Sequence, residues 1–145
     1  MARQTFTVGQ TDVDSFPKYY IRLTANTTEW YAQKQKVEDV TKLGGRVVTV
    51  SYWMKGSTSF SNAPFRSQKF GSGGSSDVSA QMGTDSVTTS WQRFTHSFTM
   101  PSIAGKTVGD GSSTEFSILR ANISSMTVDI SNVQVELGSV ATDFE

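Results

Sequence analysis

The chain has 145 residues, no cysteine, and equal numbers of basic and acidic residues, 13 of each. A chain of this length buries roughly 70% of its unfolded surface, so we expect one core and one domain over residues 1–145. The lack of cysteine excludes disulfide scaffolds and thiolate chemistry. The charges cancel and are scattered along the chain, which argues against a nucleic-acid partner.

No apolar run approaches the length that a bilayer-spanning segment needs. The first residues, Met1 to Phe6, also lack the apolar segment of a signal peptide. We therefore expect no membrane insertion and no processing.

Alternating apolar and polar residues predict strands along most of the chain, because successive side chains of a strand point to opposite faces. Serine, threonine and glycine are abundant and leucine and alanine scarce, which also favours strands joined by tight turns. The expected strands lie at residues 4–8, 19–23, 47–54, 63–70, 77–83, 91–100, 115–121 and 126–137. At most one short helix is expected, at residues 37–43 before Gly44-Gly45. The predicted fold is an all-β antiparallel sandwich of the jelly-roll type.

The last strand contains a change of phase. Its apolar residues follow a period of two as far as Ile130 and resume that period, one residue out of step, at Val133. A one-residue slip turns every later side chain to the other face unless an extra residue is absorbed. The sequence therefore predicts a bulge or bend at Ser131-Asn132, followed by a Gly-Ser turn and a short apolar hook.

The residues offer little support for catalysis. The single histidine, His96, stands on the apolar side of its strand without the order of partners that a Ser-His-Asp arrangement needs, so we expect a packed histidine. Paired carboxylates leave a polysaccharide-degrading enzyme open as a minor alternative. No cofactor is expected, apart from a calcium ion that Asp129 would help to hold on the closing strand.

Aromatic residues exceed what one apolar face requires, so some are expected near the surface. A sugar ring binds to a flat aromatic platform flanked by amide, guanidinium or carboxylate groups. Trp53 and Trp91 are expected in the core. The candidate glycan-binding residues are Trp30, Tyr31, Tyr20, Arg66, Gln68, Asp77 and Gln81, the last four on strands expected to form a concave face. Packing of Trp30 and Tyr31 at a loop or subunit contact is an equal alternative.

Several segments of the chain occur in an order that is also found in a known protein family. They are the stretch from Gln35-Lys-Val-Glu-Asp-Val to Ser-Tyr-Trp-Met-Lys55, Lys69-Phe-Gly-Ser-Gly-Gly-Ser, Trp91-Gln-Arg-Phe, Phe98-Thr-Met-Pro-Ser, and Asn132-Val-Gln-Val-Glu-Leu through Asp-Phe-Glu145. Together they resemble a family of β-sandwich domains in bacteriophage tail-fibre and other virion surface proteins. The likeness runs from about Thr5 to the last residue.

This resemblance implies a jelly roll similar to carbohydrate-binding modules, carried on fibres, tailspikes or capsids and often trimeric. Such domains usually begin with a strand that bears an Asn-Gly-Asp-Phe type motif followed by a tryptophan, and this chain lacks it. The resemblance therefore leaves open that the sheet is shorter here or that a partner supplies a strand.

Two functions follow as hypotheses. The first is a non-enzymatic virion surface protein, made in the host cytoplasm, that binds host-surface polysaccharide as a homo-oligomer. The second is a structural capsid decoration, cement or tail adaptor protein without a ligand of its own. Both imply other virion proteins as partners.

Overall fold

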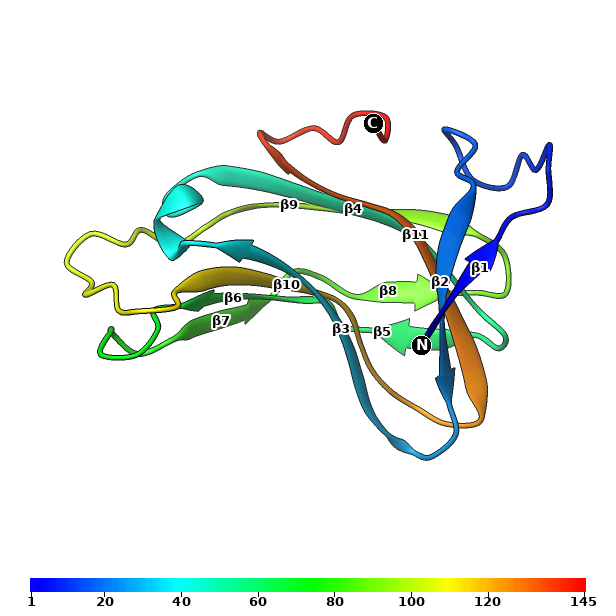
Figure 1. Ribbon diagram of the computed structural model, residues 1–145, viewed down its shortest axis with the longest axis horizontal. Coiled ribbons are helices and arrows are strands. Elements are labelled where there is room, and N and C mark those ends of the chain that lie inside the picture. The colour runs from blue at the N-terminus through cyan, green and yellow to red at the C-terminus, as the bar shows by residue number, and fades with distance from the viewer.

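A computed structural model describes all 145 residues and contains two antiparallel sheets packed face to face, with a short ribbon beside them (Figure 1). The five-stranded sheet has the order β1 (Ala2–Thr5), β2 (Tyr19–Ala25), β11 (Met126–Leu137), β4 (Val47–Gly56) and β9 (Gln92–Thr99). The four-stranded sheet has the order β3 (Glu29–Glu38), β10 (Ser113–Ile123), β6 (Phe65–Lys69) and β7 (Val78–Gln81). The ribbon pairs β5 (Phe60–Asn62) with β8 (Asp85–Val87). The predicted all-β antiparallel sandwich is confirmed.

Two short connections join the sheets at the same end of the molecule. Residues 26–28 carry the chain from β2 to β3, and residues 124–125 carry it from β10 to β11. Figure 1 shows both connections side by side at the lower edge of the view. The layers are thus linked covalently at this end.

The core lies between the sheets and is built by strict alternation in the central strands. In β4 the inward side chains are Val48, Val50, Tyr52 and Met54, all of them fully buried. They belong to one cluster of 16 buried residues that also takes apolar side chains from β10 and β11. Burial of each such side chain contributes about 1.5–3 kcal/mol, so this cluster is the main source of stability.

Two bulges interrupt the alternation. In β11 the pairing with β4 moves from Ser131 to Gln134 while the partner advances only two residues, and Asn132 has a φ of 48°. This confirms the bulge predicted at Ser131-Asn132. A second bulge occurs in β10, where Ile118 is the extra residue between Ser117 and Leu119.

The remaining expectations are met in part. Strands form close to the predicted ranges, although the first is Ala2–Thr5 rather than residues 4–8. The expected helix at 37–43 is reduced to one 3₁₀ turn, Val40–Lys42, because β3 continues to Glu38 and Asp39 caps the turn by accepting a hydrogen bond of 2.9 Å from the Thr41 amide. A helical segment of three residues is far too short to cross a bilayer. The strands β3, β5 and β8 were not predicted.

A buried polar network ties the ribbon to both sheets. Asp85 accepts hydrogen bonds from the Tyr52 hydroxyl at 2.5 Å and the Asn62 amide at 2.8 Å, and its other oxygen lies 2.9 Å from His96 Nε2. Asn62 also donates to the Ile118 carbonyl at 2.9 Å. The lone histidine is thus part of a packed polar network.

Burial of the Asp85 carboxylate opposes its ionisation, but the hydrogen bonds from His96, Tyr52 and Asn62 outweigh burial and lower its pKa below the ordinary 3.8. A carboxylate whose pKa is lowered by folding contributes stability that is complete above the unfolded pKa and is lost as the pH falls through the folded pKa. Asp85 therefore stabilises the fold at neutral pH and ceases to do so in acid.

We predict that Asp85→Asn lowers the free energy of unfolding near neutral pH by about 1–3 kcal/mol, since buried donors lose a charged acceptor. It should also flatten the loss of stability below about pH 4. Urea denaturation of both proteins from neutral pH to about pH 3 checks this. Replacement of the exposed Asp110 by Asn is the matched control. Parallel curves for wild type and Asp85→Asn would contradict the role given to Asp85.

Candidate functional site

Three aromatic rings cluster on the outer face of the five-stranded sheet. Tyr20 comes from β2, Phe6 follows β1, and Trp91 immediately precedes β9. The Phe6 and Tyr20 centroids are 4.8 Å apart, and Trp91 lies 5.4 Å from Phe6 and 5.6 Å from Tyr20. All three rings are partly exposed, so they form an aromatic surface that a ligand is able to touch.

A charged group lies beside these rings on the same face. The Arg22 guanidinium donates to both oxygens of Asp129 at 2.7 and 2.8 Å, and the Lys55 ammonium lies 4.0 Å from the same carboxylate. Lys55 is also 5.2 Å from the centre of the Trp91 ring. The hydrogen bond to Asp129 raises the pKa of Arg22, which keeps it cationic.

Strand register explains why these residues meet. Asp129 of β11 pairs with Arg22 of β2 on one side and with Lys55 of β4 on the other. Opposite charges directly across neighbouring strands attract each other. The buried alternation of the central strands sends all three side chains outward.

Three adjoining hollows follow this cluster, with volumes of about 220, 210 and 280 Å³. Lys55 lines all three, and Trp91 lines two of them. Polar groups complete the walls, including Gln10, Asp12 and Arg22. We call these hollows together the Trp91 groove.

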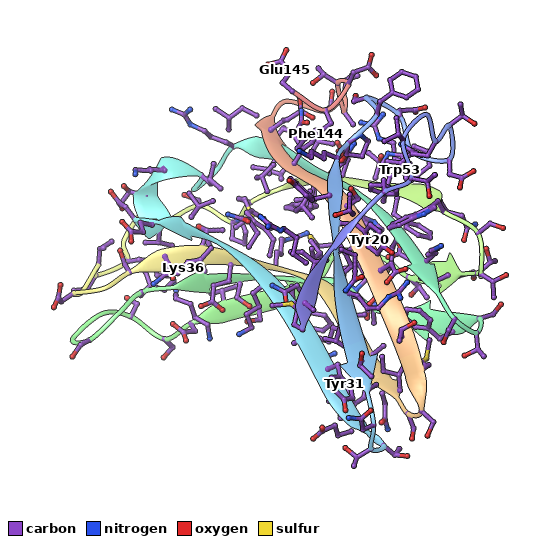
Figure 2. The ribbon with its side chains drawn as sticks, turned by 45° about the vertical axis from the view of Figure 1, so that its right-hand side comes forward. Tyr20, Tyr31, Lys36, Trp53, Phe144 and Glu145 are labelled. Carbon is purple, nitrogen blue, oxygen red and sulfur yellow. The ribbon has the colours of Figure 1, made fainter.

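The C-terminal segment covers another part of this face. Thr49 donates to the Gly138 carbonyl at 2.7 Å, Ser97 donates to the Ser139 carbonyl at 3.0 Å, and Arg93 donates to the Thr142 carbonyl. Figure 2 shows Phe144 and Glu145 above Trp53, and no residue of the C-terminal segment lines the Trp91 groove. The predicted hook after the Gly-Ser turn therefore lies against the sheet and leaves the Trp91 groove open.

Of the seven predicted site residues, only Tyr20 lines the Trp91 groove. Trp30 lies on the outer face of the other sheet, where 63% of it is exposed. The Arg120 guanidinium stacks between its ring, at 4.9 Å, and that of Phe65, at 4.2 Å. Tyr31 packs partly against the core and donates to the Thr27 carbonyl at 3.3 Å, near the lower tip in Figure 2.

The predicted concave face of Arg66, Gln68, Asp77 and Gln81 is not formed. Gln68 is 1% exposed and donates to the Pro101 carbonyl at 3.0 Å, so it points into the interior. Arg66 stacks over Phe98 at 4.4 Å, and burial lowers its pKa. The buried Gln68 is therefore not accessible to a ligand.

Asp77 and Gln81 bind neighbouring parts of their own hairpin. Asp77 accepts from the Lys69 ammonium at 2.9 Å and from the Phe70 amide at 3.1 Å. Gln81 donates to the Gly83 carbonyl at 2.7 Å and lies opposite Phe65, on the outer face with Trp30. Gln81 and Trp30 therefore share a sheet face, from which Arg66 and Gln68 are absent.

The surroundings of Asp129 do not fit a calcium ion. Calcium takes six to eight oxygen ligands, whereas both Asp129 oxygens here accept from Arg22. No group of three or more His, Asp or Glu side chains that could hold a metal ion gathers in the structure. Asp129 instead holds the side chain of Arg22 in place.

Trp53 and Trp91 were expected in the core, but the structure places both outside it. Both are only partly buried, and both lie on the outer side of the five-stranded sheet. Sequence reasoning also missed Phe6, Arg22 and Lys55, which become neighbours only through strand pairing. The sequence offered two signals, the outward phase of Arg22 in the predicted strand 19–23 and the position of Lys55 directly after the predicted strand 47–54.

Comparison with solved structures gives matches along most of the chain at low sequence identity. A tandem CBM22 domain of Paenibacillus barcinonensis Xyn10C matches 97% of this chain with a TM-score of 0.61 and 16% identity. A family 16 carbohydrate-binding module matches 83% of it, with a TM-score of 0.51 and 14% identity. Tailspike protein 4 of bacteriophage CBA120, in its enzymatically active domain, matches 94% of it, with a TM-score of 0.53 and 14% identity.

The fold is that of a carbohydrate-binding module β-sandwich. This chain spans 38% of the Xyn10C tandem domain, 77% of the family 16 module and 19% of the tailspike chain. No protein-family model and no curated protein sequence matches it. The likeness to carbohydrate-binding modules therefore concerns the fold.

We predict that Arg22→Met lowers the free energy of unfolding by about 1–3 kcal/mol, because Asp129, only 3% exposed, loses both of its close donors. The double change Arg22→Met/Asp129→Leu should recover part of this loss, since it removes the buried charge as well. Urea denaturation of the three proteins measures both effects. Lys34→Met, which breaks the exposed pair with Glu115, is the control and should cost less than about 1 kcal/mol. An equal cost for Lys34→Met and Arg22→Met would count against the assignment.

Proposed function

We propose that this protein binds glycans, without catalysis, in the Trp91 groove. The observation that carries the proposal is a cluster of three partly exposed aromatic rings, two of which, Tyr20 and Trp91, contact the Arg22–Asp129–Lys55 cluster along one line of hollows. The fold supports it, because the matched structures include carbohydrate-binding modules.

The chemistry of the groove suits a sugar. The apolar face of a sugar ring packs on an aromatic ring, and its hydroxyl groups exchange hydrogen bonds with charged and amide groups. Trp91 and Tyr20 supply the aromatic surface, while Arg22, Lys55 and Gln10 supply donors. Asp129 fixes the Arg22 guanidinium in advance, so less conformational entropy is lost when a ligand binds.

The absence of catalysis is part of the proposal. It rests on the likeness to carbohydrate-binding modules and on the use of Asp129 as a partner for two cations. A glycosidase needs two carboxyl groups free to act as acid and as base or nucleophile. Release of reducing sugar from a bound polysaccharide, abolished by Asp12→Asn, would overturn this part.

We further propose that the protein works on the surface of a bacteriophage particle and binds polysaccharide of the host cell. The sequence resemblance to virion surface domains supports this, as does the fold likeness to a tailspike domain. Several copies, such as a trimer on a fibre, raise the avidity of weak sites by a factor of roughly 10² or more. The other virion proteins that carry it would be made, like this chain, in the host cytoplasm.

We predict that Trp91→Ala weakens glycan binding about tenfold or more, since a central aromatic contact contributes about 1–2 kcal/mol or more to the free energy of binding. A glycan array of host polysaccharide fragments, read with the assembled protein, identifies the ligand, and titration calorimetry then measures the variants. Trp30→Ala is the matched control, because Trp30 lies on the opposite sheet, and it should bind as wild type does.

Two results distinguish the parts of the proposal. Loss of glycan binding in Trp30→Ala but not in Trp91→Ala would show that the glycan site lies on the four-stranded sheet. No binding by the assembled protein to any host glycan would favour the structural role of a decoration or adaptor protein.

We expect antibodies against this chain to label intact particles in electron microscopy. Removal of the protein should then lower adsorption of particles to host cells while the particles stay intact. Labelling combined with unchanged adsorption and reduced particle stability would instead support the structural role.

A further inference from the structure

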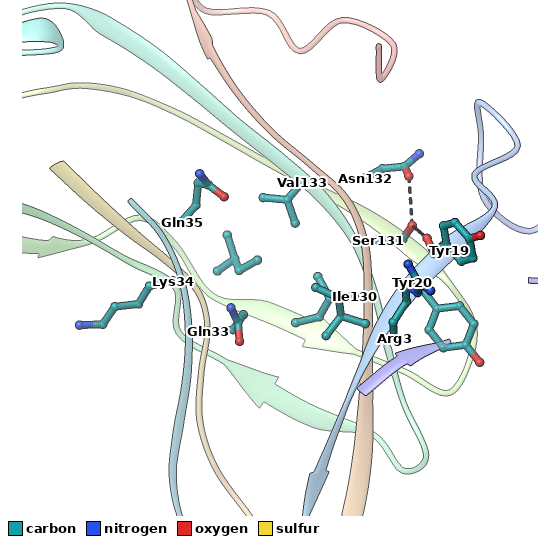
Figure 3. Close-up of a pocket in the computed structure, with 12 residues that line it drawn as sticks. Arg3, Tyr19, Tyr20, Gln33, Lys34, Gln35, Ile130, Ser131, Asn132 and Val133 are labelled. Carbon is teal, nitrogen blue, oxygen red and sulfur yellow. Dashed lines mark hydrogen bonds between the residues drawn. The ribbon is translucent and has the colours of Figure 1, made fainter. Parts of the chain in front are cut away.

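Another cavity opens between the two sheets and shares only Tyr20 with the Trp91 groove. Its volume is about 300 Å³, and its walls come from β2 and β11 on one side and β3 and β10 on the other (Figure 3). This size lies at the lower end of small-molecule sites. We call it the inter-sheet cleft.

Both bulges border the inter-sheet cleft. Ile118, the extra residue of β10, lines one wall, and Asn132 and Val133 of the β11 bulge line the other. A bulge bends its strand and locally disrupts the pairing. The two bulges therefore lie on facing sheets where the sandwich stays open.

The floor of the cleft is apolar. Ile118 and Ile130 lie at its base, and Ile21 at its edge is 40% exposed. Val133 completes this surface and points into the opening in Figure 3. Ile118 and Ile130 are each only 3% exposed, so the open aliphatic surface belongs to Ile21 and Val133, and an apolar group that covers it gains free energy.

The mouth of the cleft is positively charged. The Arg3 guanidinium stacks on the Tyr19 ring at 4.6 Å, and the Lys18 ammonium lies 5.2 Å from the same ring. Neither cation has a carboxylate within 4.0 Å, and no carboxylate lines the cleft. Lys34 also borders the cleft, but its ammonium pairs with Glu115 at 3.0 Å and points away in Figure 3.

Amide groups stand between the floor and the mouth. Gln33 projects from β3 into the cleft, and Gln35 lies two residues further along the same strand. Gln33 is partly buried, so its amide is available to a polar group of a ligand. Apolar surface, amides and unpaired cations thus follow one another from the base of the cleft to its mouth.

We propose that the inter-sheet cleft binds a free organic anion with a single aliphatic chain. The chain covers Ile21 and Val133 above the buried Ile118 and Ile130, and the anionic group lies at Arg3 beside Tyr19. The floor is aliphatic, the Tyr19 ring at the mouth is stacked by Arg3, and the positive charge there complements a carboxylate or sulfate. The cleft therefore differs from the Trp91 groove in the class of ligand it takes.

The test titrates the full chain with octanoate, decanoate and dodecanoate below their micelle concentrations, by calorimetry. One ligand per chain is expected, with affinity rising up to about fourfold for each added methylene that enters the cleft, the value of one buried methylene. Dodecanol, which lacks the charge, should bind more weakly.

Three variants locate the site. Ile21→Trp fills the cleft from its exposed edge and should abolish dodecanoate binding. Arg3→Glu should weaken it about fivefold or more, because an exposed charge pair contributes up to about 1 kcal/mol and reversal adds repulsion. Arg46→Glu, at another exposed cation remote from the cleft lining, is the matched control and should change nothing. Thermal unfolding of each variant shows that it is folded.

Several outcomes would overturn the proposal. They are no saturable binding of dodecanoate by the wild type, full binding by folded Ile21→Trp, or equal affinity for dodecanol and dodecanoate. Sedimentation with phosphatidylglycerol vesicles that depends on Arg3 would replace the free anion by a membrane surface. Trp91→Ala, which alters the Trp91 groove and no residue that lines the cleft, should bind dodecanoate as the wild type does, and this keeps the result distinguishable from the proposed glycan site.

Discussion

The packing of the inner faces of β4, β10 and β11 is the constraint on which the rest of the structure depends. Alternate side chains of these strands are buried together, and the same alternation decides which residues face outward. Asp129 and Lys55 reach the outer face because Ile130 and Met54, their neighbours in sequence, are buried. The position of the Trp91 groove is thus a consequence of the core.

The two bulges keep apolar side chains buried in the core and also leave the inter-sheet cleft open between the sheets. Without the extra residue in β11, every side chain after Ser131 would exchange faces, so the bulge is needed to keep the period of the core. The Ile118 bulge in β10 has no such signal in the sequence, because Ile118 and Leu119 are adjacent apolar residues of one run. The inter-sheet cleft exists where these two irregularities face each other.

Sequence reasoning recovered the strands with a clear period of two and the β11 bulge, since burial on one face is written directly into their residues. It missed β3 because the segment around Gln33 and Lys34 is polar on both faces at an open edge. It named both Tyr20 and Gln68 as glycan-binding candidates, and it did not foresee the burial of Gln68 because β6 has only five residues and no clear alternation. The contact of Arg22 with Asp129 joins residues 107 positions apart and depends on sheet order, which local patterns do not contain.

The open edge of the four-stranded sheet limits how copies of this protein associate. Its outermost strand, β3, carries the exposed lysines Lys34 and Lys36 beside unpaired backbone groups. Charged side chains on an edge strand disfavour the addition of a further strand from a neighbouring molecule. Multimerisation by addition of a strand beside β3 is therefore disfavoured.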